Sequence, residues 1–497
     1  MSGREIVVAG AGHNGLVAAA YLARAGHDVL VVERRQRPGG ILDGVVDNVG
    51  RLHPQVAADL ELERRGLQLE WPAARMAALR DDGPPVVFWA DAERTAAGLE
   101  EVSAADAAAY PGFDRHVRAL AGVVSAIADT TPPRLDRPTT GDAAAALRLG
   151  RAYRGLGEHE SRELTRALPM AAADLVGEWF ESDAVRGPIA ARGSFFTAMG
   201  PWSAGTAAVI LADSASDGAG AAGATAFARG GARALADALA ASAEAAGVEV
   251  RTGVEVERVL TDGEAVTGVA LGSGEHVQAA VVVSAVDPKT VLTRWLDPVV
   301  VGPQLRWRAG NIRTPGAAAR VELELSEPPA FTGLDGEAAA GRLVVARGID
   351  EVERAFDAWK YGRISERPLL EAVISGNRVN VIAQWVPYRE GLADEVGDRV
   401  VGELDRHAPG LAGLVSSRRV LTPFELEREY GLPGGHIHHA EPGLDQFFAW
   451  RPVVGLARYR LGLRGLYLCG PGAHPGGGVT GRPGRNAARE ILRDLAG

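Results

Sequence analysis

Short apolar runs and a helical pattern alternate over the first 33 residues. Residues 6–9 and 29–32 are β-branched apolar runs, which predict buried parallel strands. Residues 16–25 between them have helical spacing with alanine as filler, and Gly26 ends that pattern. The segment therefore predicts a complete βαβ unit of about 30 residues.

The pattern changes several times in the rest of the chain. Residues 100–185 predict helices, which are interrupted at Thr131-Pro132-Pro133 and at Arg137-Pro138. Apolar alternation predicts later strands at residues 248–250, 254–260, 265–271, 275–283, 318–325, 377–385 and 466–469. Helical spacing predicts later helices at residues 232–246, 350–360 and 394–408, and a last helix after the glycine-rich loop that ends near residue 480.

A glycine motif lies between the first predicted strand and its helix. Residues 10–15 follow the GxGxxG pattern of dinucleotide-binding turns. Gly10 permits the tight turn, Gly12 lets the backbone approach a pyrophosphate, and Gly15 lets helix and strand pack closely. The helix N-terminus that follows favours an anion, so the motif predicts a bound dinucleotide.

Other residues of this first unit are expected to contact the same ligand. His13 and Asn14 lie inside the glycine motif, at the expected phosphates. Glu33 ends the second predicted strand, where a carboxylate accepts ribose hydroxyls and repels a 2′-phosphate. Gly39 and Gly40 follow shortly after, and a second glycine pair at this place is typical of FAD proteins rather than NAD proteins.

Two arginines precede that glycine pair. Arg34 is expected to reach the phosphates or the ribose, as is Arg37, although both arginines can equally be solvated surface residues.

The fold class predicted from these patterns is α/β. A discontinuous Rossmann-type cofactor domain is expected at residues 1–70, 220–300 and 426–497. An inserted α+β substrate domain is expected at residues 71–219 and 301–425.

The C-terminal glycine loop is more specific than the first motif. Residues 465–481, GLYLCGPGAHPGGGVTG, are followed by Arg485-Asn486-Ala487-Ala488. Together with residues 6–40, this segment resembles the two FAD motifs of the phytoene desaturase-like flavoproteins, and above all their pyridine nucleotide-disulfide oxidoreductase-like branch. The resemblance covers nearly the whole chain and continues in order through residues 178–182, 231–256, 284–288 and 434–451.

The resemblance implies an FAD-dependent oxidoreductase, which is a dehydrogenase, desaturase or oxidase. Such an enzyme moves a hydride from a C–H bond of a small or lipid-like substrate to flavin N5. The substrate is expected to be apolar or amphipathic and to enter a large apolar cavity, and the electron acceptor to be O2 or a quinone. By the same resemblance, the backbone of Val256 contacts the adenine. Gly470, Gly472, Gly478 and Val479 are expected at the flavin, near the N-terminus of the last helix.

Catalytic residues are less visible than cofactor motifs, because the flavin performs the difficult step. His474 lies in the second motif, and His439 ends the branch's GGxIxH pattern, so these two are the catalytic candidates. Trp202 and Trp450 are the candidates for walls of the substrate pocket. For each of these residues, an ordinary packing role is the alternative.

No metal is expected. His436, His438 and His439 form an HxHH cluster, but no acid or cysteine stands beside them at ligand spacing. Cys469 is the single cysteine of the chain, which excludes a disulfide framework and a CxxC redox pair. A cysteine that ends a buried strand is more often inert packing than a covalent flavin tether.

Three alternatives to the oxidoreductase remain. A redox-neutral flavin isomerase would show the same sequence features. A flavin amine oxidase usually has a lysine near N5, and only Lys289 or Lys360 could supply it. A non-catalytic flavin-binding scaffold would also keep the glycine motifs.

Composition and charge narrow the partners. The chain has 497 residues, a net charge of −10 and 46% hydrophobic residues, as in a soluble globular protein without attraction to nucleic acid. It has no leader-like N-terminus and no apolar run of about 18 residues, so a cytoplasmic location is expected. Peripheral membrane contact and the oligomeric state are left open.

Overall fold

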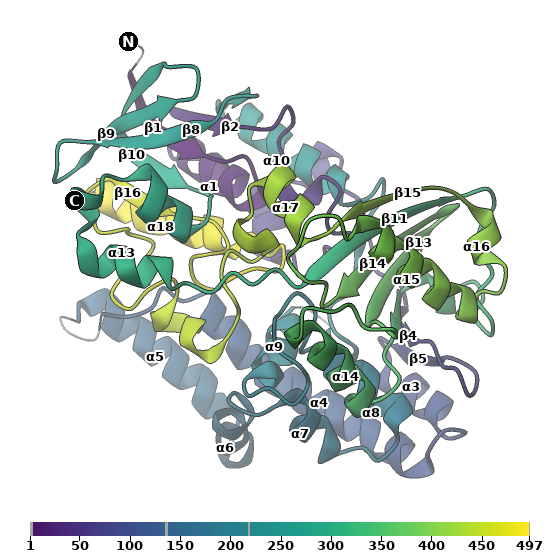
Figure 1. Cartoon of the computed structure of the whole chain (residues 1–497). Coiled ribbons are helices and arrows are strands. Elements are labelled where there is room, and N and C mark those ends of the chain that lie inside the picture. Colours follow the sequence, from purple (N-terminus) through teal and green to yellow (C-terminus); the bar gives the residue numbers. More distant parts are fainter. Residues whose placement is uncertain (1–2, 135–137, 217–218, 497) are drawn as a thin grey trace.

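Two seven-stranded sheets organise the chain (Figure 1). The computed structural model describes residues 3–134, 138–216 and 219–496. The first sheet lies close to both termini, the second lies beside it, and the helices of residues 104–213 lie below both sheets in this view. Of the two predicted interruptions, Thr131-Pro132-Pro133 lies outside helices, while Arg137 lies outside the described residues.

The first sheet combines a parallel part with an antiparallel meander. Its strands are β1 (Gly3–Ala9), β2 (Val29–Glu33), β7 (Glu249–Thr252), β8 (Val256–Thr261), β9 (Val266–Leu271), β10 (His276–Ser284) and β16 (Leu466–Leu468). The order is β7-β2-β1-β10-β9-β8, and β16 pairs with the last residues of β10. The pairs among β7, β2, β1, β10 and β16 are parallel, which confirms the predicted Rossmann-type fold.

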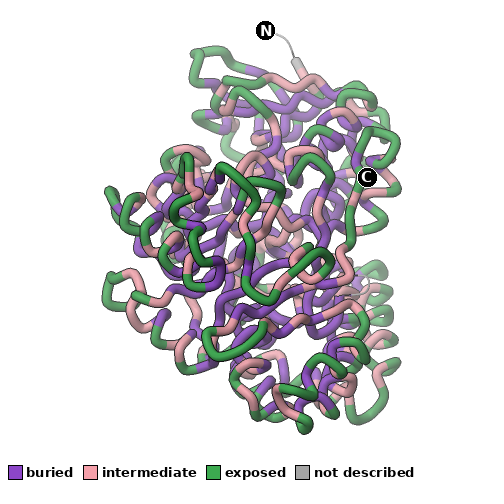
Figure 2. The backbone as a smooth tube through the Cα atoms, turned by 90° about the vertical axis from the view of Figure 1, so that its right-hand side faces the viewer, coloured by how far each residue is buried: buried purple, intermediate pink, exposed green. Residues whose placement is uncertain are grey.

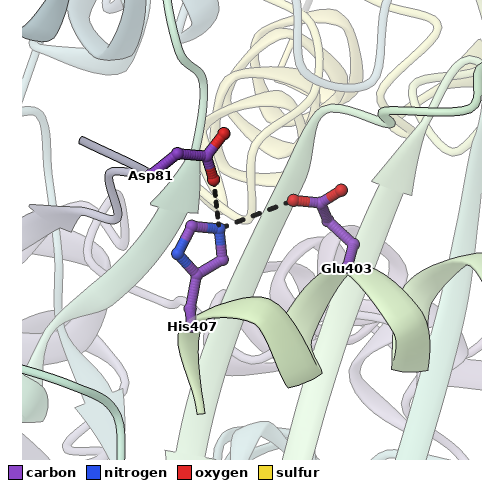
Figure 3. Close-up of side chains that lie close together, drawn as sticks. All are labelled: Asp81, Glu403 and His407. Atoms are coloured by element: carbon purple, nitrogen blue, oxygen red, sulfur yellow. Dashed lines mark ion pairs between the residues drawn. The ribbon is translucent and has the colours of Figure 1, made fainter. Parts of the chain in front are cut away.

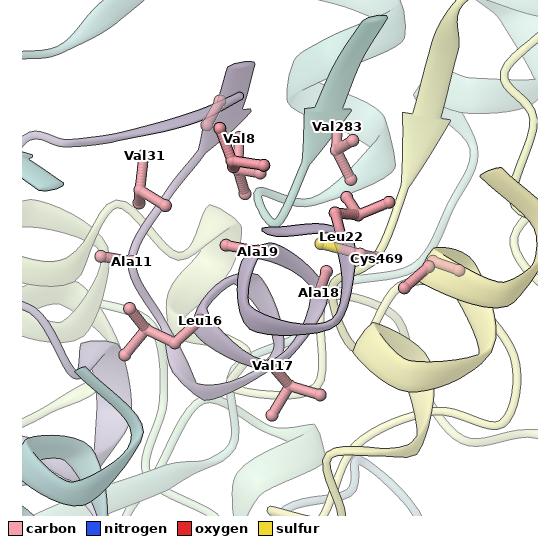
Figure 4. Close-up of a cluster of buried hydrophobic side chains, with 14 of the residues drawn as sticks. Val8, Ala11, Leu16, Val17, Ala18, Ala19, Leu22, Val31, Val283 and Cys469 are labelled. Carbon is pink, nitrogen blue, oxygen red and sulfur yellow. The ribbon is translucent and has the colours of Figure 1, made fainter. Parts of the chain in front are cut away.

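Helices with many buried alanines and leucines pack on this sheet. They are α1 (His13–Arg24), α10 (Ala232–Ala245) and α18 (Arg482–Leu495). Val8 on β1 lies between Val31 and Val283 in the register, and these valines pack over Leu16 and Leu22 of α1 (Figure 4). All five side chains are fully buried, and each contributes about 1.5–3 kcal/mol through burial.

The second sheet is antiparallel except for one pair. Its order is β15 (Val415–Leu421), β11 (Ala318–Leu325), β14 (Arg378–Gln384), β13 (Leu370–Ser375), β12 (Arg342–Val345), β4 (Ala74–Ala78) and β5 (Val86–Trp89). The pair β12·β4 is parallel. One face packs on Val396, Val400 and Leu404 of α15 (Ala393–His407).

The other face of the second sheet packs on several helices through one apolar cluster. These helices include α4 (Ala104–Ala128), α7 (Ala172–Gly177), α8 (Asp183–Ala191), α9 (Thr206–Asp213) and α14 (Ile349–Lys360). The remaining longer helices are α2 (Pro54–Asp59), α3 (Ala92–Leu99), α5 (Thr140–Gly155), α6 (Glu158–Ala167), α13 (Pro303–Gly310) and α17 (Pro423–Tyr430). A small sheet of β3 (Leu69–Glu70) and β6 (Phe227–Ala228) pairs two distant segments.

The strands and helices that were predicted individually are present with small shifts at their ends, but the prediction missed five strands of the second sheet: β4, β5, β12, β13 and β15. The last helix begins at Arg482 rather than near Thr480, because Gly481 takes a positive φ of 69° before it. The strands of the first sheet come from residues 3–33, 249–284 and 466–468, and those of the second from residues 74–89 and 318–421. The domain boundaries themselves stay a prediction.

Buried residues run through both sheets and the helices that pack on them. Figure 2 shows buried backbone through the interior, while the exposed segments lie mainly at outer turns and helix faces. Among the described residues, no helix combines the length and the apolarity that a membrane crossing requires.

Candidate functional site

A cavity of about 210 Å³, the dinucleotide cavity, opens at the carboxyl ends of β1, β2 and β10. Ala9, Glu33 and Ala285 line it where these strands end. In open α/β sheets, ligands bind in this crevice, at the point where the order of the strands reverses. Because β2 and β10 lie on either side of β1, that point lies at the glycine motif.

Each glycine of the first motif has a separate geometric role. Gly10 has a φ of 100°, which a side chain disfavours. A Cβ on Gly15 would overlap the Gly10 carbonyl oxygen and lie 3.0 Å from the Ala285 Cβ, so helix and strand could not pack as they do. A Cβ on Gly12 would meet no protein atom within 4 Å, because Gly12 faces the cavity. Space for a ligand is therefore reserved at Gly12.

The start of α1 offers polar groups to that space. Gly12 is its N-cap, and no side chain caps the helix. Both amide atoms of the Asn14 side chain and Nε2 of His13 are buried without a hydrogen-bond partner in the part of the chain that the structure describes. Burial lowers the pKa of His13 to about 4, so its ring is neutral at neutral pH. These orphaned polar groups at a helix N-terminus fit the phosphates of FAD.

Glu33 is held at the ribose end of the cavity. Its side chain accepts the N–H of Ala11 at 2.7 Å through Oε2 and the N–H of Arg35 at 2.9 Å through Oε1. Although Glu33 is only 7% exposed, each carboxylate oxygen keeps a further lone pair for a ribose hydroxyl. Val256, the residue expected at the adenine, lines the same cavity.

The glycine pair folds back onto the first motif. Gly39 donates its N–H to the Ala11 carbonyl at 2.8 Å and forms a bridge with Gly12, while Gly40 lines the cavity. Arg34 also lines it but donates to the carbonyl of Glu429 at 3.0 Å, so its guanidinium is partly engaged.

The second glycine loop packs against backbone and side chains of segments that are distant in sequence. Gly470 lies so close to the Ala285 carbonyl, and Gly472 to Pro288, that neither has room for a Cβ. The positions of Cβ atoms on Gly477 and Gly478 are taken by the His438 ring and the Arg51 guanidinium. Gly478 and Val479 line a second cavity, whereas Pro471, between Gly470 and Gly472, lines the dinucleotide cavity.

This second cavity, the charged cavity, has a volume of about 120 Å³. Its charged lining residues are Asp47, Arg51, Arg192, Asp213, Arg342 and Glu371. A third cavity of about 110 Å³, the aromatic cavity, is lined by Phe195, Phe447, Phe448 and aliphatic side chains of α4 and α9. The two share Arg51, Phe195, Val209 and His438.

The predicted histidines separate into different surroundings. His439, with a φ of 60°, lines the dinucleotide cavity, and burial lowers its pKa to about 3. His438 lines the charged and aromatic cavities, and burial lowers its pKa well below the usual value. His436 pairs with Glu441 at 3.1 Å instead. The cluster therefore does not converge on one metal site.

His474 lies at the aromatic cavity. Its Nε2 donates to the carbonyl of Ile127 at 3.0 Å, which leaves the lone pair on Nδ1. Burial lowers the pKa of His474 to about 4. The neutral ring thus has a fixed tautomer.

Neither of the predicted tryptophans lines the charged cavity or the aromatic cavity. Trp202 is 50% exposed and lines a more open surface pocket of about 540 Å³, and Trp450 is 51% exposed. Phe447 and Phe448, next to Trp450, line the aromatic cavity instead. Neither lysine lines the dinucleotide, charged or aromatic cavity: Lys289 Nζ donates to the carbonyl of Ile312 at 3.4 Å, and Lys360 pairs with Asp357 at 2.6 Å.

One group of side chains has the composition of a metal site. Asp81, Glu403 and His407 lie close together, with His407 Nε2 3.7 Å from Asp81 and 3.5 Å from Glu403 (Figure 3). Arg347 pairs with both carboxylates, and Arg367 pairs with Asp81. These cations neutralise the acids, so the group ties α15 to the second sheet.

Sequence reasoning missed Arg51 and Phe195, which the charged and aromatic cavities share with Val209 and His438, and it preferred His439 to His438. Arg51 and Phe195 lie on segments that are distant in sequence and carry no local motif. Arginine is so common in this chain that no single one stands out.

Comparisons with known proteins agree with this geometry. A family model of the flavin containing amine oxidoreductases matches residues 61–409, and a model of NAD(P)-binding Rossmann-like domains matches residues 8–61. Pyridine nucleotide-disulfide oxidoreductase domain-containing protein 2 of Rattus norvegicus is 30% identical over 99% of this chain and 94% of its own length. Hydroxyneurosporene desaturase of Rubrivivax gelatinosus is 27% identical over 99% of this chain and 94% of its own.

A solved structure shares the fold. Putrescine oxidase bound to putrescine superposes with a TM-score of 0.59 at 16% identity, over 100% of this chain and 99% of that chain. At this identity the likeness shows the arrangement of the elements alone.

Proposed function

Because the chain belongs to the flavin-containing amine oxidoreductases, it is an FAD-dependent oxidoreductase, and we propose that it oxidises a C–H bond of a small amphipathic molecule. The observation that carries this proposal is the contact of three cavities along the second glycine loop. The dinucleotide cavity shares Ile41 and Ile437 with the charged cavity, which shares Arg51 and His438 with the aromatic cavity.

The first motif would hold the FAD phosphates and ribose. The start of α1 would bind the pyrophosphate through its free N–H groups and Asn14, and Glu33 would accept the ribose hydroxyls. Gly478 and Val479 would lie at the flavin. When bound, FAD supplies the acceptor for a hydride.

The aromatic cavity would hold the substrate. Phe195, Val209 and Phe448 line it, and with a substrate bound these apolar side chains would exclude water, which would strengthen the electrostatic interactions inside. His474 would take a proton from the substrate at Nδ1, because its Nε2 hydrogen bond to Ile127 fixes the tautomer. His439, at the dinucleotide cavity, would position the cofactor rather than act on the substrate.

An amine substrate is disfavoured by the charges of the aromatic cavity. Arg51, Arg451 and Arg482 line it, and its described lining residues include no carboxylate. A protonated amine would meet these cations in a medium of low dielectric constant, where repulsion is strong. The absence of Lys289 and Lys360 from its described lining also separates the site from the lysine-containing amine oxidases.

The test is reduction and reoxidation of the purified protein in an anaerobic cuvette. The cofactor is first released by acid and identified by chromatography, and we expect stoichiometric FAD. The bound flavin is then photoreduced, air is admitted, and the return of the oxidised band is followed. Fast return with peroxide identifies an oxidase, and slow return indicates a dehydrogenase with a quinone or protein acceptor, or an isomerase that works with reduced flavin. A protein without flavin, or one that no substrate reduces, would contradict the proposal.

A further inference from the structure

The arginines around the two substrate-side cavities differ in how they are paired. Arg192 binds Asp213 at 2.7 Å and also donates to Ser214 and the Ala221 carbonyl. Arg342 binds Glu371 at 3.0 Å and donates to Thr225 and the Ala222 carbonyl. Both guanidinium groups are therefore saturated by the fold.

Arg51 is the exception. It is half-buried, lines both cavities, and has no hydrogen-bond or ion-pair partner within residues 3–134, 138–216 and 219–496. Asp213, whose charge acts on Arg51, accepts its hydrogen bonds from Arg192. A guanidinium has five N–H donors in a fixed fork, and leaving them unused in the interior is costly.

The surroundings of Arg51 add positive charge. Arg451 is 2% exposed and donates to the carbonyls of Pro471, His438 and Ala440, with no carboxylate at ion-pair distance among the described residues. Arg482 shares Asp129 with Arg485. The aromatic cavity therefore combines apolar walls with an uncompensated cationic end.

The glycine loop also reserves space for this guanidinium. Gly478 has a φ of 109°, and a Cβ there would overlap Nη1 of Arg51. Arg51 is thus held against the loop expected at the flavin, where a group that it binds would be close to the reacting centre.

We propose that Arg51 binds a carboxylate of the substrate, so that the enzyme acts on a carboxylic acid whose apolar body fills the aromatic cavity. A planar fork that binds both carboxylate oxygens gives orientation as well as affinity. Phe195, Val209 and Phe448 surround the apolar body. This inference names the substrate class and rests on the proposed function.

The experiment measures the binding of phenylacetate, its neutral isostere phenylacetamide, and phenethylamine to the holoprotein. Calorimetry and the perturbation of the flavin spectrum both report binding without turnover. We expect phenylacetate to bind at least about 10-fold more tightly than phenylacetamide, and phenethylamine not to bind.

Variants then assign the preference to Arg51. Arg51→Gln should weaken phenylacetate about 10- to 100-fold and leave phenylacetamide unchanged. Arg51→Lys should keep part of the preference, because it keeps the charge but loses the fork. Arg115→Gln, which removes an exposed arginine of α4, is the control for charge and should behave as the native protein.

Two results would overturn the inference. One is tighter binding of phenethylamine than of phenylacetate. The other is an Arg51→Gln protein that loses flavin or shifts the flavin potential but still prefers phenylacetate, which would make Arg51 a cofactor ligand. Failure of the proposed function can be distinguished from failure of this inference. It would appear as flavin that is missing or cannot be reduced, while calorimetry would still measure the binding of phenylacetate.

Discussion

The two glycine loops at the cofactor site make room for different things. In the first loop, Gly15 lets α1 pack on the Gly10 carbonyl, and Gly12 keeps space for the ligand. In the second loop, Gly477 and Gly478 make room for the side chains of His438 and Arg51. Gly15 thus serves backbone packing within one βαβ unit, while Gly477 and Gly478 serve side chains that arrive from distant parts of the chain. A glycine motif therefore identifies a close approach without identifying what approaches.

The largest expected effect is a loss of stability at low pH, because both loops have buried neutral histidines beside them. His13 lies at the first loop, and His439 and His474 at the second, with pKa values lowered by burial to about 4, 3 and 4. The unfolded chain binds protons below its pKa of about 6.5, but the folded chain does not, so stability present above that pH is lost as the pH falls toward about 4. Between pH 7 and about pH 5, each of these histidines should lower the free energy of unfolding by about 2 kcal/mol, and the three together by about 6 kcal/mol.

Urea unfolding at several pH values measures this loss. Carboxylates with lowered pKa values add their own loss only at lower pH, because their unfolded pKa is about 4. His13→Asn, His439→Asn and His474→Asn should each reduce the loss between pH 7 and pH 5 by about 2 kcal/mol. An unchanged slope in all three variants would show that the rings are not buried neutral.

The second prediction separates the two roles within the first loop. Gly15→Val should push α1 off the sheet and lower the free energy of unfolding of the apoprotein by about 3 kcal/mol. Gly12→Val, whose side chain enters the cavity, should cost the apoprotein less than about 1 kcal/mol. Both variants should lose bound flavin, as measured by the ratio of flavin to protein. Equal destabilisation by the two substitutions would contradict the assignment.

The sequence predicted the first loop well because its partners are local. The βαβ pattern, the glycine spacing and Glu33 all lie within one short segment, and the sheet confirms their arrangement. It preferred His439 to His438, but the local pattern does not show which ring faces which cavity. The left-handed backbone at His439, with a φ of 60°, turns the chain between them and sends the two rings to different cavities. The cavity around Arg51 depends on tertiary contacts that no local pattern contains.

The third prediction tests whether the second loop makes room for Arg51. Gly478→Ala should cost about 1–3 kcal/mol, because alanine is strained at a φ of 109° and its Cβ overlaps the guanidinium. Part of this cost should disappear in the Arg51→Gln background, which gives a coupling of about 0.5 kcal/mol or more. Gly12→Ala combined with Arg51→Gln is the matched control and should be additive. If the effects of Gly478→Ala and Arg51→Gln on the free energy of unfolding were additive, only the backbone strain at Gly478 would matter.

The smallest expected effect lies outside both loops. Trp202 and Trp450 are half-exposed, and neither lines the charged or the aromatic cavity. Trp202→Ala and Trp450→Ala should each change the free energy of unfolding by less than about 0.5 kcal/mol and leave the binding of phenylacetate unchanged. Phe448→Ala is the comparison, because the Phe448 ring lines the aromatic cavity. It also meets the His474 ring edge-on, with the two ring centroids 5.3 Å apart. It should weaken phenylacetate by about 3- to 10-fold through lost apolar contact. If Trp450→Ala weakened binding more than Phe448→Ala, the substrate would lie outside the aromatic cavity. The substrate site would then not be formed by the distant segments that meet at the second loop.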